Sequence, residues 1–223
     1  MTFSLLGRCA RTGRLGLVVA SSSPAVAARC AHVRPRIGVA ASQNVTDPRL
    51  GPLLLDELSG GRGPRAAIDA VVGGAPHIEH RQLLVLDARG EGAAYTGAAA
   101  LGRHGHRIAR DCVVGGNLLA DESVLDAVAE SFGASPALAL GDRLVEALRA
   151  GATAGGEAGP VHSAGLVMTG EVQWPIADLR VDWHDEPIER LGVVWDVYRS
   201  QLDDYVARAL DPTAAPRYGV PGE

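Results

Sequence analysis

Lysine is absent from the chain, and all 21 basic residues are arginines. No lysine amine can therefore assist catalysis. Aromatic residues make up only 4% of the sequence and the formal net charge is −5, a composition that argues against nucleic-acid binding. No apolar run approaches the roughly 20 residues that a membrane-spanning helix needs. We therefore expect neither a nucleic-acid partner nor a membrane partner.

Cysteine is scarce, with three widely spaced residues at Cys9, Cys30 and Cys112. An odd number at this spacing gives neither a disulfide framework nor a CxxC zinc motif. Buried thiols in a reducing compartment are the simplest interpretation, so we expect a cytoplasmic protein of bacterial type.

Motifs for metals and cofactors are also missing. His104 and His106 lie close together and His184 precedes an aspartate, but no HExxH spacing supports a metal site. The glycine-rich run 60–63 has no GK[ST] ending and no preceding strand, so it is not a phosphate-binding loop. We expect no metal and no cofactor.

Acidic residues are missing from positions 1–46, which hold six arginines. Buried strands that carry no charge explain this pattern, and a locally positive site for an anionic substrate is the alternative. An arginine-rich start also resembles a targeting segment with a cleavage site at Ala25–Ala27. Its apolar stretch, Leu15–Ala20, is shorter than the roughly 7–15 residues that an export signal needs, so we do not favour that interpretation.

Apolar patterning predicts one α+β domain over residues 1–210, followed by a flexible C-terminal tail at 211–223 with three prolines. Strands are predicted at 2–8, 15–22, 37–41, 82–86, 92–96, 112–114, 163–168 and 179–183. Helices are predicted at 50–58, 64–72, 122–132, 137–150 and 188–210. Hairpins and paired helices in this order indicate two stacked antiparallel sheets with helices outside.

Thr2 opens the first predicted strand directly after Met1. Removal of Met1, which a small second residue permits, would give Thr2 a free α-amine beside its hydroxyl. Such an amine has a pKa of about 7.7–8.0, so one residue would carry both nucleophile and base. Ser21 and Ser22 end the return strand of the same hairpin. A hydroxyl there could hydrogen-bond the α-amine, although ordinary strand-end serines fit equally well.

Asn117 follows two glycines at the end of a predicted strand. An amide side chain or exposed N–H groups at such a place can face a developing oxyanion. An asparagine that accepts a left-handed turn conformation is the alternative.

Three further residues are candidates for substrate binding. Gln43 and Asn44 end a strand and could line a pocket. Arg180 alternates with Asp178 and Asp182, so it either belongs to an Arg–carboxylate ladder or binds a substrate carboxylate.

Seven short stretches occur in a specific order: MTFS at 1–4, LGLVVAS at 15–21, IGVAASQN at 37–44, HRQ at 80–82, GGNLLA at 115–120, SA at 163–164 and DLRVD at 178–182. Together they resemble a little-characterised family of N-terminal-nucleophile (Ntn) hydrolases, domain of unknown function 1028, over residues 1 to about 200. The resemblance implies an Ntn-hydrolase-like four-layer αββα sandwich, with Thr2 opening a central strand, and hydrolysis of an amide bond. Many relatives carry a basic residue where this chain has Ser22, and some carry Gln where it has His162.

These observations favour an Ntn amidohydrolase that cleaves a carbon–nitrogen bond in a small amide or peptide-like metabolite, with Thr2 as nucleophile. The alternative is a catalytically inactive small-molecule-binding protein on the same fold, which Ser22 suggests. Trp195 and Tyr198 suit a core and a subunit contact equally, so assembly into a homo-oligomer stays an open expectation.

Overall fold

The opening hairpin lies at the centre of the larger sheet. β1 (Thr2–Arg8) and β2 (Leu15–Ser21) pair antiparallel, with Phe3 opposite Ala20. In the computed structural model, which describes residues 1–221, β8 (Cys112–Leu119) and β9 (Ser163–Thr169) flank this hairpin. The edge strands are β7 (Arg103–Ala109) and β10 (Pro175–Val181), which gives the order β10-β9-β2-β1-β8-β7.

The smaller sheet has the order β3-β4-β5-β6. Its strands are β3 (Ala31–Arg34), β4 (Gly38–Asn44), β5 (Arg81–Asp87) and β6 (Gly92–Thr96), and the one-turn helix α1 (Ala27–Cys30) leads into it. The β5–β6 turn contains Gly90 with a φ of +82°, a left-handed conformation that glycine adopts without strain.

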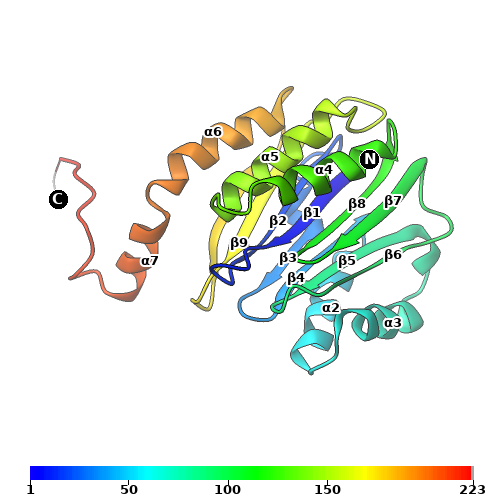
Figure 1. The fold of residues 1–223 in the computed structure, drawn as a ribbon, viewed down its shortest axis with the longest axis horizontal. Coiled ribbons are helices and arrows are strands. Elements are labelled where there is room, and N and C mark those ends of the chain that lie inside the picture. The colour runs from blue at the N-terminus through cyan, green and yellow to red at the C-terminus, as the bar shows by residue number, and fades with distance from the viewer. Residues whose placement is uncertain (222–223) are drawn as a thin grey trace.

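Helices cover both outer faces of the paired sheets (Figure 1). α4 (Ser123–Ala134), α5 (Leu140–Thr153) and α6 (Pro187–Arg199) pack on the larger sheet. α2 (Leu50–Ser59) and α3 (Pro64–Gly74) pack on the smaller sheet, and the 3-10 turn η1 (Ile78–His80) leads into β5. The predicted α+β, four-layer αββα sandwich is therefore confirmed.

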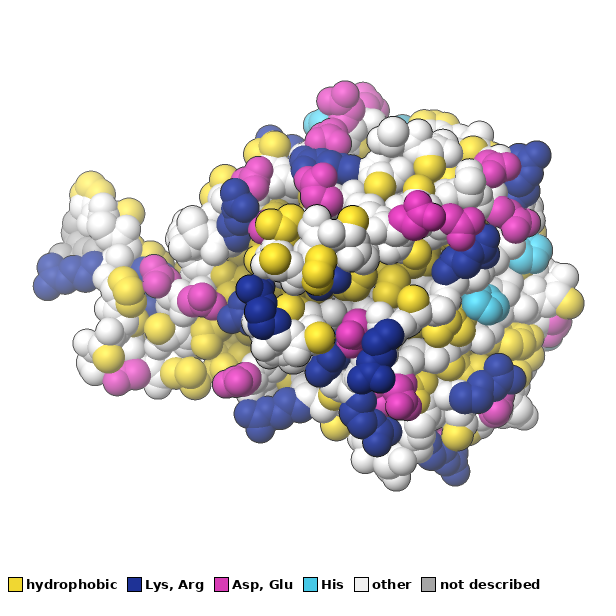
Figure 2. Space-filling view, in the orientation of Figure 1, with side chains coloured by type: hydrophobic (Ala, Val, Ile, Leu, Met, Phe, Trp, Pro, Cys, Tyr) yellow, Lys and Arg dark blue, Asp and Glu magenta, His cyan; other side chains and the backbone are white. Residues whose placement is uncertain are grey.

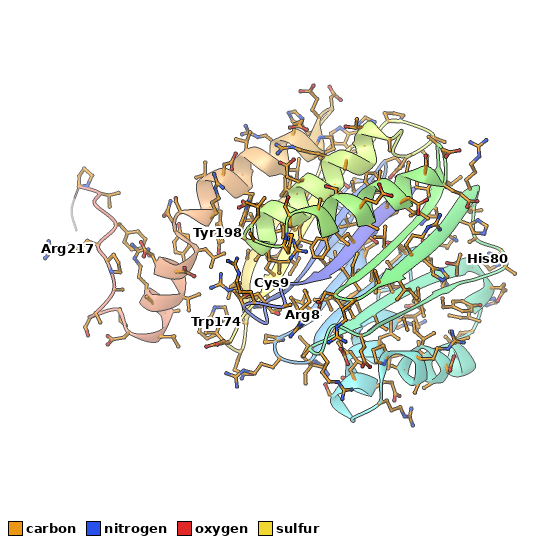
Figure 3. All side chains as sticks on the ribbon, viewed as in Figure 1. Arg8, Cys9, His80, Trp174, Tyr198 and Arg217 are labelled. Atoms are coloured by element: carbon orange, nitrogen blue, oxygen red, sulfur yellow. The ribbon has the colours of Figure 1, made fainter. Side chains whose placement is uncertain are left out.

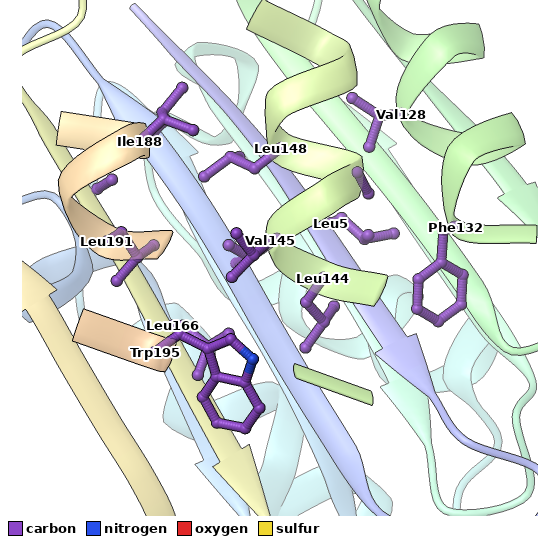
Figure 4. Packing of buried hydrophobic residues seen from close by; sticks show 14 of the residues in the cluster. Leu5, Val128, Phe132, Leu144, Val145, Leu148, Leu166, Ile188, Leu191 and Trp195 are labelled. Carbon is purple, nitrogen blue, oxygen red and sulfur yellow. The ribbon is translucent and has the colours of Figure 1, made fainter. Parts of the chain in front are cut away.

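Successive side chains of β1 point alternately toward the helices and toward the second sheet. Phe3 and Leu5 face the helices and join a core that includes Phe132, Leu144 and Trp195 (Figure 4). Thr2, Ser4 and Leu6 face the other way, into the space between the two sheets. That inner space is apolar around Leu6 and polar at the Thr2 end of the strand.

The long C-terminal helix predicted at 188–210 is two helices, α6 and α7 (Leu202–Leu210). Ser200 and Gln201 separate them, and the Ser200 hydroxyl donates to the carbonyl of Val197 at 3.0 Å. A serine side chain that bonds the preceding turn competes with helical backbone bonds and bends the helix there. In Figure 1, α7 and residues 211–221 project away from the sandwich.

The end of the helix predicted at 137–150 is wrong, because α5 continues through Gly151 to Thr153. A Cβ at Gly151 would lie 2.6 Å from Cγ2 of Val128 and 2.9 Å from Cε2 of Phe3. Glycine at this position therefore permits close packing of α5 on α4 and β1. The last predicted strand is also shifted, since β10 ends at Val181.

Two strands were not predicted, β3 and β7. β7 reads RHGHRIA and lies at an edge of the sheet, where polar side chains reach solvent and no apolar run develops. It joins β8 through a tight turn in which Asp111 has a φ of +62°.

Cleavage near residues 25–27, the export alternative, would remove β1 and β2 and with them the middle of the larger sheet. Among residues 1–221, no helix has the length and apolar character to cross a bilayer. In the predicted tail, residues 211–221 contain no helix or strand, and Arg208 of α7 donates to the carbonyl of Pro216 at 3.0 Å. Residues 222–223 of that tail lie outside the described residues.

Candidate active site

Four polar side chains form a buried row across the larger sheet at one end. Thr2 pairs with Asn117 on β8, and Ser21 pairs with Ser163 on β9. The β1–β2 register, with Phe3 opposite Ala20, places Thr2 opposite Ser21. Directly opposed residues share a face of the sheet, so all four side chains point between the sheets. Their exposed fractions are 5% for Thr2, 1% for Ser21 and 0% for the other two.

The hydroxyls of Thr2 and Ser21 converge on the peptide bond between Met1 and Thr2. Thr2 Oγ1 donates to the Met1 carbonyl at 2.5 Å and lies 3.4 Å from Ser21 Oγ. Ser21 Oγ donates to the same carbonyl oxygen and accepts the backbone N–H of Ser23 at 3.1 Å. Both hydroxyls are thus held at the first peptide bond of the strand.

Glu157 is the acidic residue of the site, and sequence reasoning missed it. It lies in the segment after α5, which pairs with the end of β8 through a bridge to Leu119 and a 2.9 Å bond from Ala158 N to the Leu118 carbonyl. Its carboxylate is 5% exposed and accepts the backbone N–H of Ser22. Burial raises the pKa of Glu157 to about 7, and the nearby N-terminal ammonium group and the Ser22 bonds only partly oppose that shift.

A chain of amide side chains supports the row from below, between the sheets. Ser4 Oγ donates to Gln43 Oε1 at 2.6 Å, and Gln43 Nε2 donates to Gln82 Oε1 at 2.8 Å. Gln82 Nε2 lies within 3.1 Å of three acceptors, which are Thr96 Oγ1, Gly105 O and Gly116 O. Gln43, predicted to line a pocket, is therefore a buried link between the sheets, and Gln82 is a second residue that sequence reasoning did not assign.

Asn117 connects this chain to the row. Its Nδ2 donates to Gln82 Oε1 at the long distance of 3.4 Å, and its Oδ1 is buried with no hydrogen-bond partner. Leu118, the next residue, has a φ of +52°, an uncommon conformation for a bulky side chain. Strained backbone of this kind is frequent at functional sites, which supports Asn117 as a site residue.

Three of the predicted binding residues are engaged elsewhere or through the backbone. Asn44 has a φ of +74° and joins two loops, since Nδ2 donates to the His80 carbonyl and Oδ1 accepts the Leu101 N–H. Ser22 bonds Glu157 through its backbone N–H. Arg180 lies on the edge strand β10 in a two-bond ion pair with Asp178, at 2.8 and 2.7 Å.

Arg180 does not approach Thr2, because β9 and β2 separate its strand from β1. The Arg–carboxylate ladder is thus the arrangement that the structure contains. Beside Ser163, which ends the row on β9, the neighbouring side chains are aromatic. His162 stacks on Trp183 with ring centroids 4.3 Å apart, and its backbone N–H donates to the Ser21 carbonyl at 2.9 Å.

No three His, Cys, Asp or Glu side chains within residues 1–221 are placed to hold a metal ion. The polar groups that the geometry does bring together are three hydroxyls, one amide and one carboxyl, near the first residue of a central strand. Side chains of these types supply nucleophiles, oxyanion donors and proton carriers in enzymes.

The fold and the row define an αββα sandwich protein with a buried threonine at the start of a central strand. The chain matches a family of unknown function, DUF1028, over residues 2–191, and it belongs to that family. A crystal structure of a DUF1028 protein from Silicibacter pomeroyi is 30% identical, with a TM-score of 0.84 and 93% coverage of each chain. The predicted membership of DUF1028 is confirmed.

Two more distant structures are also similar to this chain. An Anbu (Gly-1) mutant from Hyphomicrobium sp. strain MC1 is 10% identical with a TM-score of 0.46, covering 99% of this chain and 100% of that one. Anbu (ancestral beta-subunit) from Yersinia bercovieri is 11% identical with a TM-score of 0.40, covering 96% and 99%. At these values neither supports an argument about function. No curated protein matches the chain.

Proposed function

We propose that this protein is an Ntn amidohydrolase that cleaves a small amide or peptide-like substrate, with Thr2 as the nucleophile once Met1 is removed. The observation that supports this most is the position of the Thr2 hydroxyl. It faces the space between the sheets, 3.4 Å from Ser21 Oγ, and its strand neighbour on the other side is Asn117.

Removal of Met1 would change this site in two ways. The carbonyl that now accepts both hydroxyls would leave, which frees Thr2 Oγ1 and Ser21 Oγ for other partners. The amide nitrogen of Thr2 would become a primary amine at the same place. Nucleophile and base would then belong to one residue.

The reaction would proceed in two balanced steps. Thr2 Oγ1 attacks the substrate carbonyl carbon while its proton passes to the α-amine, and that proton is then delivered to the leaving nitrogen as the carbon–nitrogen bond breaks. Water, activated by the same amine, hydrolyses the resulting ester and releases the acid. Threonine is regenerated.

Three neighbours have proposed roles around this chemistry. Asn117 Nδ2, held only by a 3.4 Å contact to Gln82, would donate to the oxyanion, and its unpartnered Oδ1 would accept from the α-amine. Ser21 Oγ would position that amine. Glu157, whose pKa burial raises to about 7, would stabilise the ammonium form electrostatically.

The test combines intact mass with a nucleophile probe and turnover assays. We expect purified protein to begin at Thr2, to release amine or ammonia from a panel of small amides and dipeptide amides, and to be acylated on Thr2 by a β-lactone. Thr2→Ala should abolish both signals with the fold retained, while Thr12→Ala, at an exposed turn position, should leave them unchanged. Full activity in protein that retains Met1 would overturn the proposal.

A binding protein without catalysis is the second candidate, and one observation favours it. Thr2 is only 5% exposed with Met1 in place, and the Met1 side chain packs at Gly159, where a Cβ would lie 3.1 Å from Met1 Cε. If Met1 stays, this closed site offers no nucleophile to a substrate. Saturable binding of an amide without turnover, equal in wild type and Thr2→Ala, would select this candidate.

A further inference from the structure

A cavity of about 420 Å³ lies at the opposite end of the larger sheet from Thr2. The β1–β2 turn, the β7–β8 turn and the adjoining ends of α4 and α5 form its walls. Because β1 runs from the row to this cavity, the two places lie about 20 Å apart at the usual rise of an extended strand. Nothing in the proposed reaction uses this cavity.

Its lining is strongly basic. Four arginines contribute to the walls against a single carboxylate, that of Asp111; they are Arg8, Arg11, Arg110 and Arg143. Two of them come from the acid-free segment 1–46 and two from distant parts of the sequence. Figure 3 shows Arg8 beside Cys9 where the opening hairpin turns, and Figure 2 shows basic side chains close together in the middle of the same view.

Arg143 is the unusual member, because it is only 6% exposed and forms no ion pair within residues 1–221, although the Asp111 carboxylate acts on it at longer range. Its Nε and Nη2 donate to one carbonyl oxygen, that of Phe132, at 3.2 and 2.8 Å. Its guanidinium carbon lies 3.9 Å from the centre of the Phe132 ring. Burial lowers the pKa of Arg143. A buried guanidinium without a directly paired anion is costly, and an incoming anion would offset that cost.

The remaining arginines are also incompletely satisfied. Arg8 Nη1 donates to Asp111 Oδ1 at 2.8 Å, but Arg8 Nε is buried with no hydrogen-bond partner. Arg11 and Arg110 are exposed and take part in no ion pair among the described residues. The cavity lining therefore contains four guanidinium groups and one carboxylate.

We propose that this cavity binds a small anionic ligand through a carboxylate or phosphate group, with the buried Arg143 and the half-buried Arg8 as inner donors and Arg11 and Arg110 at the rim. Guanidinium groups bind both kinds of oxyanion with paired N–H bonds. The volume lies within the range of about 300–1,000 Å³ that is usual for small-molecule sites.

Calorimetric titration of the full-length protein with inorganic phosphate and with succinate, at constant ionic strength, tests this proposal. We expect saturable binding of at least one of them, and which one binds identifies the oxyanion. The double variant Arg11→Gln/Arg110→Gln should bind at least tenfold more weakly, since charge-assisted bonds are lost. The double variant Arg62→Gln/Arg65→Gln, which removes two exposed arginines near α2 and α3, is the charge-matched control and should bind like wild type.

Arg143→Met tests the buried donor and should abolish binding, with circular dichroism to verify that the variant folds. The rim variant keeps the test decisive if Arg143→Met does not fold. Thr2→Ala should bind the anion normally, so failure of the proposed hydrolysis leaves this result unaffected. Absence of saturable binding, or equal weakening in the rim variant and its control, would overturn the proposal.

Discussion

Both carboxylate oxygens of Glu157 accept the backbone N–H of Ser22, at 3.2 and 3.1 Å. This contact joins the segment after α5 to the end of β2, directly beside the hydroxyl of Ser21. It also holds a carboxyl group with a raised pKa next to the chain's terminal amine. The electrostatics of the site therefore depend on a residue far from the opening hairpin in sequence.

Glu157→Gln should make stability less sensitive to pH. The carboxyl has a pKa of about 7 in the folded protein, above its ordinary value of 4.5, so between these values the folded state holds a proton that the unfolded state releases. Stability from this group is full below pH 4.5 and is lost as the pH rises through 7. The free energy of unfolding of the variant, relative to that of wild type, should therefore rise by about 1 to 3 kcal/mol from pH 5 to pH 8, as measured by urea unfolding.

The matched control is Glu130→Gln, at an exposed position on α4. The difference in free energy of unfolding between this variant and wild type should not change over that pH range. A difference between Glu157→Gln and wild type that stays constant from pH 5 to pH 8 would contradict the assignment of the raised pKa.

Asp47→Asn should show the opposite pH dependence. Asp47 accepts Arg49 Nε and Nη2 at 2.9 and 2.7 Å, and these bonds, with the Arg49 backbone N–H, lower its pKa to about 2. The stabilisation is present above the ordinary value of 3.8 and is lost as the pH falls through 2. We expect a loss of about 1 to 2 kcal/mol at pH 7 that shrinks steadily below pH 4, measured by thermal unfolding.

Asp69→Asn serves as its control, because that carboxylate forms an exposed pair with Arg65. Such pairs contribute at most about 0.5 kcal/mol, so this variant should unfold nearly like wild type. If Asp47→Asn loses no more stability than Asp69→Asn at pH 7, the pairing with Arg49 contributes nothing measurable.

Gln82→Leu should destabilise the fold more than an ordinary polar substitution. It removes the acceptor for Gln43 and Asn117 and leaves the carbonyls of Gly105 and Gly116 without their donor, all between the sheets. Buried groups that lose partners cost about 1 to 3 kcal/mol each when no water replaces them, so we expect a loss of about 2 to 4 kcal/mol in urea unfolding. Gln173→Leu, at an exposed position, should change stability by less than about 0.5 kcal/mol.

Two Gly→Ala substitutions in helices should change the stability of the protein in opposite directions. A Cβ at Gly141 in α5 would overlap the Trp195 ring, whose Nε1 is fixed by a 2.7 Å bond to Asp142, so Gly141→Ala should cost about 1 to 3 kcal/mol. Gly73 in α3 has open space around the same position, and Gly73→Ala should gain about 0.5 to 1 kcal/mol. Differential scanning calorimetry on both variants checks the pair, and equal signs would contradict the packing argument.

The local pattern of apolar and turn-forming residues was sufficient to predict most elements of the fold. The opening hairpin is two nearly continuous apolar runs around a turn with Gly13 at a φ of +70°, so strands and turn are legible from sequence. β7 was not, because its residues RHGHRIA are polar and become a strand only by pairing with β8. The break after Arg199 also escaped the pattern, since the apolar stripe continues through both helices.

Some residues of the candidate site could likewise be predicted from the sequence, and others could not. Thr2, Ser21 and Asn117 end up in one row because strand register alone aligns them, and register follows from the hairpin and its neighbour. Glu157 enters only through tertiary folding, in a segment whose composition indicates a loop. Its one sequence signal is that it is the single charged residue in the Gly- and Ala-rich stretch 151–161. Arg180 and Gln43 were predicted to bind substrate, but their positions in the sheets give them structural contacts instead. Arg180 forms an ion pair with Asp178 on an edge strand, and Gln43 links the two sheets.

The enclosure of Met1 against Gly159 matters for how the protein is handled at the bench. Extra residues fused ahead of Met1 would begin next to this contact, at the start of a strand that is paired on both sides. Affinity tags for expression belong after α7, where the chain already leads away from the sandwich.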